Sequence, residues 1–194
     1  MKHYETKSKM TFLVAVLITA CTLQGCTDSP KEVKETAAEG EAPTYKEMVA
    51  DNPTAEADLM VMAEFSNAIA AGDSVKMKSL LSDTAIVYGP SPADSSSGEQ
   101  YVTSWVEGGF KTATNREVAF VQQTFKVLQG NLAGNWVSQW SDYSFTQAGK
   151  TVKFPYHSIS RIVDGKIVSS RLYYDREYAL TQLGSKLTPP ERTM

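Results

Sequence analysis

The strongest constraint on the fold of this chain is a change of hydrophobic period near residue 115. Beyond it, apolar and polar residues alternate in four segments, which predicts strands at about 116–129, 135–146, 151–163 and 166–174. The segments are separated by QGNLAG, TQAGK and DG, and the pair Asp164-Gly165 is a strong signal for a hairpin. Four successive strands joined by short turns predict an antiparallel meander.

The preceding part of the chain has the period of helices. A first helix is predicted to begin after Asn52-Pro53 and to end at Gly72, with apolar residues at Leu59, Met62, Phe65 and Ile69. A second helix is predicted at about 74–81, a strand at 84–89 and a third helix at 99–110. The stretch GPSPADSSSG (89–98) predicts a mobile loop. Helices followed by a meander of strands form an α+β pattern.

The N-terminus has the composition of an export signal. Three lysines precede an uncharged run at 11–23, which is shorter than the roughly 20 apolar residues of a membrane-spanning helix. The sequence Leu23-Gln24-Gly25-Cys26 resembles the lipobox of bacterial lipoproteins. That resemblance implies cleavage before Cys26 and attachment of lipid, including palmitate, at this residue. The alternative is a plain signal peptide or an anchor helix in which Cys26 has no special role.

These features predict how the chain is organised. We expect a signal peptide at 1–25, a lipidated Cys26 with a flexible tether at 26–52, a domain at 53–187 and a disordered tail at 188–194. The tether is rich in Glu, Lys, Ala and Pro and poor in large apolar residues, so it cannot form a core. Its C-terminal part, Tyr45 to Ala50, is a candidate helix that docks on the domain. The expected location is the cell envelope, with the lipid on Cys26 contacting the membrane. Because Thr27 rather than aspartate follows the cysteine, the outer membrane is favoured where a cell has two.

Composition argues against several classes of partner and cofactor. The net charge is -3 and no run of Lys or Arg occurs after the signal, so no nucleic acid is expected as a partner. After cleavage the chain would keep one histidine, His157, and no free cysteine, which disfavours a zinc site. No spacing of Asp and Glu suggests a calcium loop. We therefore expect neither a metal nor a cofactor.

Two longer phrases carry a resemblance to a known superfamily. They are IAAGDSVKMKSLLSDTAIVYGP, a helix-helix-strand opening, and ISRIVDGKIVSSRLYYDREYALTQLG, a hairpin followed by a short helix. Over about residues 55–185 the chain resembles the NTF2-like superfamily, in its SnoaL-like and ketosteroid-isomerase-like branch. The resemblance implies a cone-shaped, strongly curved antiparallel sheet wrapped around three N-terminal helices (the cystatin-like or NTF2-like roll), with an apolar pocket. Members include enzymes as well as binding and scaffold proteins, so fold alone does not define function.

The Asp164-Gly165 turn predicts the register of the last hairpin, provided that no bulge intervenes. Val163 would then oppose Lys166, and His157 would oppose Leu172. The other face would bring Phe154, Tyr156, Ser158, Ser160 and Ile162 opposite Asp175, Tyr173, Arg171, Ser169 and Ile167. On that face a carboxylate and a guanidinium lie among aromatic residues, where they could pair with each other or hold a polar ligand.

The candidate catalytic residues are Asp175, Arg171 and His157. The resemblance implies an Asp or His base in an apolar pocket, where burial raises the pKa of an Asp. Each candidate also has an ordinary structural role: Asp175 as a helix cap, Arg171 in a salt bridge, and His157 in packing or at a dimer face. The candidate ligand-binding residues are Tyr88, Trp105, Asp142, Tyr156 and Tyr173.

Three functions are compatible with this sequence. The first is a membrane-anchored lipoprotein whose pocket binds a small apolar or mixed-polarity molecule without catalysis. The second is a cofactor-free isomerase, dehydratase or hydrolase that uses an Asp base, with Asp142 as the alternative to Asp175. The third is a docking or dimerisation domain whose sheet face carries Ile159, Val163, Val168 and Leu172.

Overall fold

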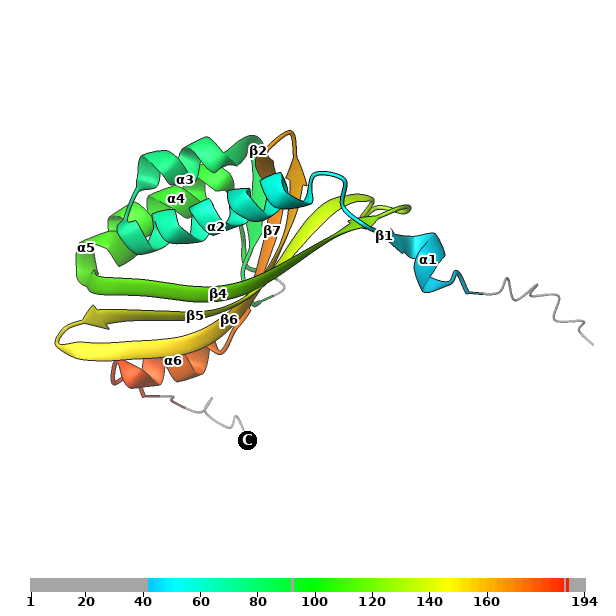
Figure 1. Ribbon diagram of the computed structural model, residues 1–194. Coiled ribbons are helices and arrows are strands. Elements are labelled where there is room, and N and C mark those ends of the chain that lie inside the picture. Colours follow the sequence, from blue (N-terminus) through cyan, green and yellow to red (C-terminus); the bar gives the residue numbers. More distant parts are fainter. Residues whose placement is uncertain (1–41, 92, 187, 189–194) are drawn as a thin grey trace, which may run out of the picture. The chain divides into compact units, whose positions relative to one another are not determined.

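The computed structural model describes residues 42–91, 93–186 and 188 (Figure 1). The predicted signal peptide, Cys26 and most of the tether lie outside these residues. Within the described residues, no helix is both long enough and apolar enough to cross a membrane.

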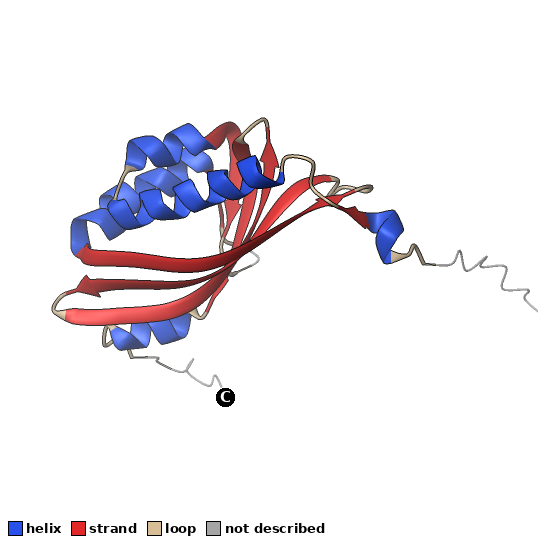
Figure 2. Ribbon diagram, viewed as in Figure 1, coloured by secondary structure: helices blue, strands red, loops and turns tan. Residues whose placement is uncertain are grey.

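A seven-stranded sheet forms one layer of the domain (Figure 2). Its spatial order is β1 (Val49–Ala50), β4 (Ala113–Val127), β5 (Gly134–Gln147), β6 (Lys150–Val163), β7 (Lys166–Tyr174), β2 (Leu81–Tyr88) and β3 (Ser95–Ser97). All neighbouring pairs are antiparallel except β2 and β7, which are parallel. The predicted meander of four strands is confirmed as β4 to β7.

Both tight turns of the meander have two central residues with positive φ. Asp164 and Gly165 have φ of 49° and 70°, and Ala148 and Gly149 have φ of 50° and 75°. Left-handed conformations at both central residues match the right-handed twist of the flanking strands, as in a type I′ hairpin. The hairpin predicted from Asp164-Gly165 is therefore confirmed.

Helices form the second layer and cover one face of the curved sheet (Figures 1 and 2). They are α2 (Ala55–Ala71), α3 (Ser74–Leu80), α4 (Gly98–Ser104), the π-helical turn η1 (Trp105–Gly109) and α5 (Phe110–Thr112). Helix α2 ends at Gly72 with φ of 77°, as predicted. The core between the layers is built from residues such as Met62, Met77, Val102, Val137, Ile162 and Ile167.

The segment that precedes α2 joins the sheet. Helix α1 (Tyr45–Met48) leads into β1, which pairs with β4, although the sequence places both in the tether. Asn52 is buried, and its side-chain amide donates to Asp58 Oδ2 at 2.8 Å and to Thr124 Oγ1 at 2.7 Å. These hydrogen bonds connect the start of the domain to α2 and β4.

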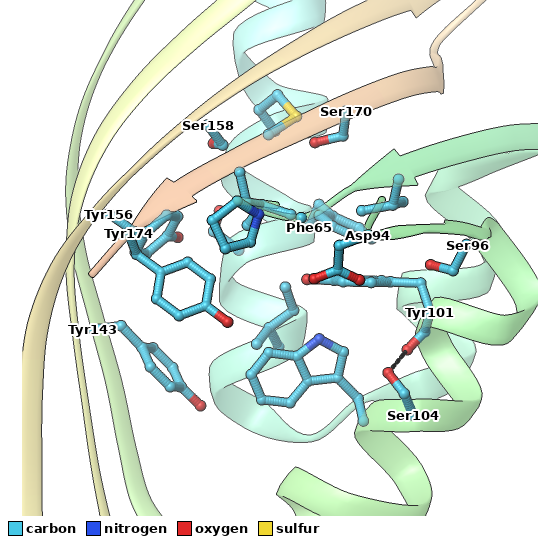
Figure 3. Close-up of a pocket in the computed structure, with 18 of the residues that line it drawn as sticks. Phe65, Asp94, Ser96, Tyr101, Ser104, Tyr143, Tyr156, Ser158, Ser170 and Tyr174 are labelled. Carbon is cyan, nitrogen blue, oxygen red and sulfur yellow. Dashed lines mark hydrogen bonds between the residues drawn. The ribbon is translucent and has the colours of Figure 1, made fainter. Parts of the chain in front are cut away.

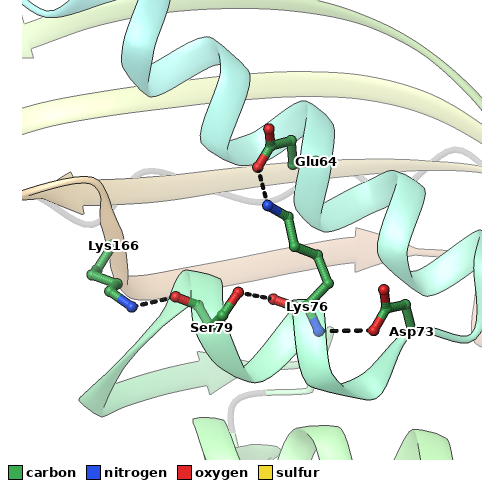
Figure 4. Close-up of polar contacts among 5 residues, drawn as sticks. All are labelled: Glu64, Asp73, Lys76, Ser79 and Lys166. Carbon is green, nitrogen blue, oxygen red and sulfur yellow. Dashed lines mark hydrogen bonds and ion pairs between the residues drawn. The ribbon is translucent and has the colours of Figure 1, made fainter.

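Polar contacts hold α3 between α2 and the turn before β7 (Figure 4). The Asp73 carboxylate caps α3 by accepting from Lys76 N at 2.9 Å, and Lys76 Nζ lies 2.6 Å from Glu64 on α2. On the other side, Lys166 donates to the backbone carbonyl oxygen of Ser79. Helix α3 is therefore connected by polar contacts to α2 on one side and to the start of β7 on the other.

The loop prediction for residues 89–98 is wrong at its C-terminal end. Ser95–Ser97 form β3, which pairs with β2, and Ser97 caps α4 by accepting from Gln100 N. The backbone N–H of Gly89 also donates to Asp94 O at 2.7 Å. The segment thus returns along the edge of the sheet, which sequence composition alone does not indicate.

Candidate ligand-binding site

A pocket of about 420 Å³ lies between the helices and the inner face of the sheet (Figure 3). Its size is in the range of small-molecule sites. Its walls come from α2, the loop after β2, α4 with η1, and strands β2, β3 and β5 to β7. Segments far apart in the sequence therefore meet around one space.

Seven aromatic rings line the pocket. The strands contribute Tyr143, Phe154, Tyr156 and Tyr174, and the helices contribute Phe65, Tyr101 and Trp105. Neighbouring rings contact each other, with centroid distances of 5.4 Å for Phe154–Tyr174 and 6.0 Å for Trp105–Tyr143. These distances are typical of aromatic pairs that stabilise one another.

The π-helical turn η1 positions Trp105. A side chain at Gly109 would collide with the Trp105 ring, since an added Cβ would lie 2.6 Å from Cε3 and 2.8 Å from Cζ3. Glycine at this position therefore lets the indole lie over the helix turn. Irregular helix turns of this type often occur at functional sites.

The inner end of the pocket is polar. Ser66, Ser158 and Ser170 line it, and all three are buried. Ser66 Oγ donates to Gln139 Oε1 at 2.9 Å, and Ser160 Oγ donates to Ser170 Oγ at 2.9 Å. Buried polar atoms normally have partners.

The Tyr143 hydroxyl departs from that rule. Tyr143 is 5% exposed and lines the pocket, yet its hydroxyl has no hydrogen-bond partner among the described residues. Gln139 Nε2 and Ser141 Oγ, which are also buried, lack partners in the same part of the domain. An unpaired buried donor costs about 1–3 kcal/mol, so this region favours a molecule that supplies an acceptor.

Burial changes the titration of the pocket tyrosines. It raises the pKa of Tyr143 to about 12, and it raises the pKa of Tyr101 and of Tyr174 above the usual range. Burial is the main cause of the raised pKa of Tyr174. The positive charge of Arg176 lowers this pKa, and the carboxylate of Asp94 raises it. At neutral pH these hydroxyls are therefore protonated and can donate hydrogen bonds.

Asp94 is the one carboxylate among the described lining residues, and no Lys, Arg or His is among them. The loop after β2, which the hydrogen bond from Gly89 N to Asp94 O closes, positions Asp94. Figure 3 shows its carboxylate directed into the pocket. Its side chain has no hydrogen-bond or ion-pair partner within the part of the chain that the structure covers.

The register predicted for the last hairpin is wrong beyond Ile162. Val163 pairs with Lys166 and Ile162 with Ile167, but Arg161 pairs with Ser169. Val168 is thus an extra residue on β7, a β-bulge, and every later residue of β7 changes face. Tyr156 therefore opposes Tyr174 and His157 opposes Tyr173.

The structure separates the predicted site residues into two groups, and the bulge accounts for the positions of those that follow it on β7. Trp105 and Tyr156 line the pocket. The others are not among its lining residues: Arg171 stacks on Tyr88, with 4.6 Å from Cζ to the ring centroid, and Asp142 is exposed. His157 stacks between Trp140 and Tyr173, at 5.2 and 6.1 Å, and its Nε2 lies 2.8 Å from Ser138 Oγ.

Asp175 has the geometry of a helix cap. It is exposed, precedes α6 (Arg176–Gln182), and its Oδ1 accepts from Tyr178 N at 2.8 Å. Nothing in the structure brings Asp175, Arg171 and His157 together as an acid–base site.

The face proposed for docking is divided as well, because Ile159 opposes Arg171 on the outer side whereas Leu172 lines the pocket.

Sequence reasoning missed Asp94, Tyr101, Tyr143 and Tyr174 as pocket residues. The signal for Tyr143 was available, because it alternates with Asp142 and so lies on the opposite face of β5 from Trp140. Tyr174 required knowledge of the bulge, and Asp94 required the path of the loop.

No family model matches the chain, and no curated protein matches it. Several solved structures do. IdmH from Streptomyces antibioticus, described as a candidate polyketide cyclase, is 18% identical over 66% of this chain and 99% of its own, with a TM-score of 0.53. PrhC from Penicillium brasilianum NBRC 6234 is 12% identical over 66% of this chain and 87% of its own, with a TM-score of 0.56.

A third structure is a protein with a ketosteroid isomerase-like fold from Catenulispora acidiphila, solved in complex with trimethylamine. It is 16% identical over 66% of this chain and 97% of its own, with a TM-score of 0.53. Identities this low are informative about the fold alone. The curved sheet, the helices that cover it and these similarities together show that the described domain has the NTF2-like fold, as the sequence resemblance predicted.

Proposed function

We propose that this chain is a lipid-anchored protein of the bacterial cell envelope whose domain binds a small molecule without catalysing a reaction. The observation that carries the binding function is the aromatic pocket, in whose wall the Tyr143 hydroxyl has no hydrogen-bond partner among the described residues. The lipobox-like sequence before Cys26 and the segment that follows it motivate the anchor.

The polar groups of the pocket favour binding over catalysis. Proton transfer generally uses groups whose pKa lies near the working pH, such as histidine or a buried carboxyl. Among the described lining residues there is no histidine, cysteine or lysine, and the pKa of each buried tyrosine is raised away from neutrality. Asp94 is left as a single carboxylate without an acid–base partner.

The binding function can be tested by native mass spectrometry of the full chain carrying Cys26→Ser, purified without detergent. We expect a small molecule to be retained. Ser104→Trp, which adds a large ring to the pocket wall, should abolish retention, whereas Thr103→Trp at an exposed position of the same helix, outside the lining, should not. Conversion of a retained molecule into a product on incubation would instead support the enzyme alternative.

The anchor is tested by membrane fractionation and by labelling with palmitate. The wild-type chain should be recovered with membranes and labelled, and Cys26→Ser should be neither. A Cys26→Ser chain that stays in the membrane fraction would contradict the anchor and leave the pocket proposal intact.

A second candidate function is self-association through the outer face of the sheet. Val121, Trp140, His157 and Tyr173 form one row across four strands. Trp140 and Tyr173 are 49% and 47% exposed, and adjacent exposed apolar residues often mark an interface. Sedimentation at increasing concentration should show a dimer that Trp140→Lys abolishes and that Tyr178→Lys, on α6, leaves unchanged.

A further inference from the structure

The charge on the described lining residues of the pocket is negative. Its described lining residues include the carboxylate of Asp94 and no basic side chain. The two nearby arginines are engaged or directed elsewhere. Arg116 donates to the carbonyl oxygens of Ala70 and Ala113, at 3.1 and 2.5 Å, and Arg176 is exposed in the first turn of α6. Neither lines the pocket, so among the described residues no positive side chain balances the carboxylate of Asp94, an exposed residue that lines it.

The aromatic wall also favours a positively charged ligand. The face of an aromatic ring is electron-rich and attracts cations, most strongly where water is excluded. Seven rings line this space. On the outer surface the domain already shows the same interaction between Arg171 and the ring of Tyr88.

The remaining features limit the size and polarity of the ligand. A volume of about 420 Å³ accommodates a small organic molecule rather than a metal ion. Within the described residues, no group of three or more His, Cys, Asp and Glu lies together to bind a metal. The serines at the inner end and the Tyr143 hydroxyl provide hydrogen bonds for a polar end of the ligand.

We propose that the ligand is an organic cation, an amine or quaternary ammonium compound, whose charge lies between the Asp94 carboxylate and the aromatic wall. This inference rests on the proposed binding function and adds the class of ligand to it. An anionic ligand is disfavoured, because it would face Asp94 without a basic partner. A neutral ligand could donate a hydrogen bond to the carboxylate but would lack the attraction between opposite charges.

The inference is tested with two probes of nearly equal shape and different charge, phenyltrimethylammonium and tert-butylbenzene. Calorimetric titration of the full chain carrying Cys26→Ser should show that the cation binds about tenfold more tightly or better. Asp94→Asn should reduce the affinity for the cation by about tenfold and leave tert-butylbenzene unaffected. Asp142→Asn removes the same charge from the outer face of the sheet and should leave both affinities unchanged.

The outcomes distinguish this inference from the function on which it rests. Equal or tighter binding of tert-butylbenzene would refute the proposal of a cationic ligand, and so would an unchanged affinity of Asp94→Asn for the cation. Either result would leave the proposed binding function intact. If neither probe binds and the purified chain retains a neutral molecule, the cationic ligand is again refuted and the binding function is kept. Binding of neither probe by a chain that retains nothing would overturn both.

Discussion

The backbone N–H of Gly89 donates to the carbonyl oxygen of Asp94 at 2.7 Å, and the Asp94 carboxylate occupies the place of a side chain on Gly89. A Cβ added at Gly89 would collide with a carboxylate oxygen and would lie 2.6 Å from Cγ. The absence of a side chain at Gly89 is therefore what allows this carboxylate to reach the pocket.

Gly89→Ala should consequently displace the Asp94 carboxylate without removing its charge. We expect the affinity for phenyltrimethylammonium to fall several-fold, while the free energy of unfolding changes by about 1 kcal/mol or less, because the loop is at the surface. Gly108→Ala is the matched control, since an added Cβ there meets nothing within 4 Å. An unchanged affinity in Gly89→Ala would show that the position of the carboxylate does not matter.

Asp175 should behave as a helix cap. Asp175→Ala removes the acceptor for Tyr178 N and should lower the free energy of unfolding by about 1 kcal/mol, whereas Asn caps nearly as well as Asp. Chemical denaturation of Asp175→Ala and Asp175→Asn measures this difference. Neither variant should change the retention of a ligand, and a large loss of retention with Asp175→Asn would restore Asp175 as a site residue.

The parts of the fold that sequence predicts are those with local signals. Asp164-Gly165 specifies its turn because both residues readily adopt positive φ, and Gly72 ends α2 for the same reason. The strands follow from alternation. None of these signals requires knowledge of which strands are neighbours.

The face of β7 could not be predicted because it depends on pairing. Val168 is the extra residue of the bulge, yet Ile167-Val168-Ser169 contains no glycine or other mark of an insertion. One additional residue then moves Tyr174 into the pocket and Asp175 out of it. Asp94 was missed for a related reason, since its location depends on the pairing of β3 with β2.

Asp58 should be important for stability rather than binding. It is 4% exposed, and its Oδ2 accepts from Asn52 Nδ2 at 2.8 Å, Thr54 Oγ1 at 2.8 Å and Asn135 Nδ2 at 3.2 Å. Asp58→Ala leaves these donors without their acceptor, so we expect the free energy of unfolding to fall by roughly 2–4 kcal/mol.

Chemical denaturation beside Asp73→Ala tests this expectation. Asp73 is an exposed cap of α3, and its loss should cost only about 1 kcal/mol. Equal effects of the two substitutions would mean that the buried cluster around Asp58 contributes no more than a surface cap.

Tyr143 connects the pocket to the pH dependence of stability. Its hydroxyl has no partner among the described residues, so Tyr143→Phe loses no hydrogen bond there. We expect the free energy of unfolding at neutral pH to stay the same or to rise by about 1 kcal/mol. Affinity for the natural ligand should fall if the ligand accepts a hydrogen bond from this hydroxyl.

At alkaline pH the two proteins should diverge. Burial raises the pKa of Tyr143 to about 12 in the folded domain, whereas an unfolded tyrosine ionises at about 10. The unfolded chain therefore releases its proton first, so this contribution to stability is complete below about pH 10 and is lost as the pH rises toward 12. Denaturation at pH 8, 10 and 11 should show a smaller alkaline loss in Tyr143→Phe than in wild type. Tyr178→Phe removes a phenol from the surface and should follow wild type, and a Tyr143→Phe curve that does the same would refute the effect of burial.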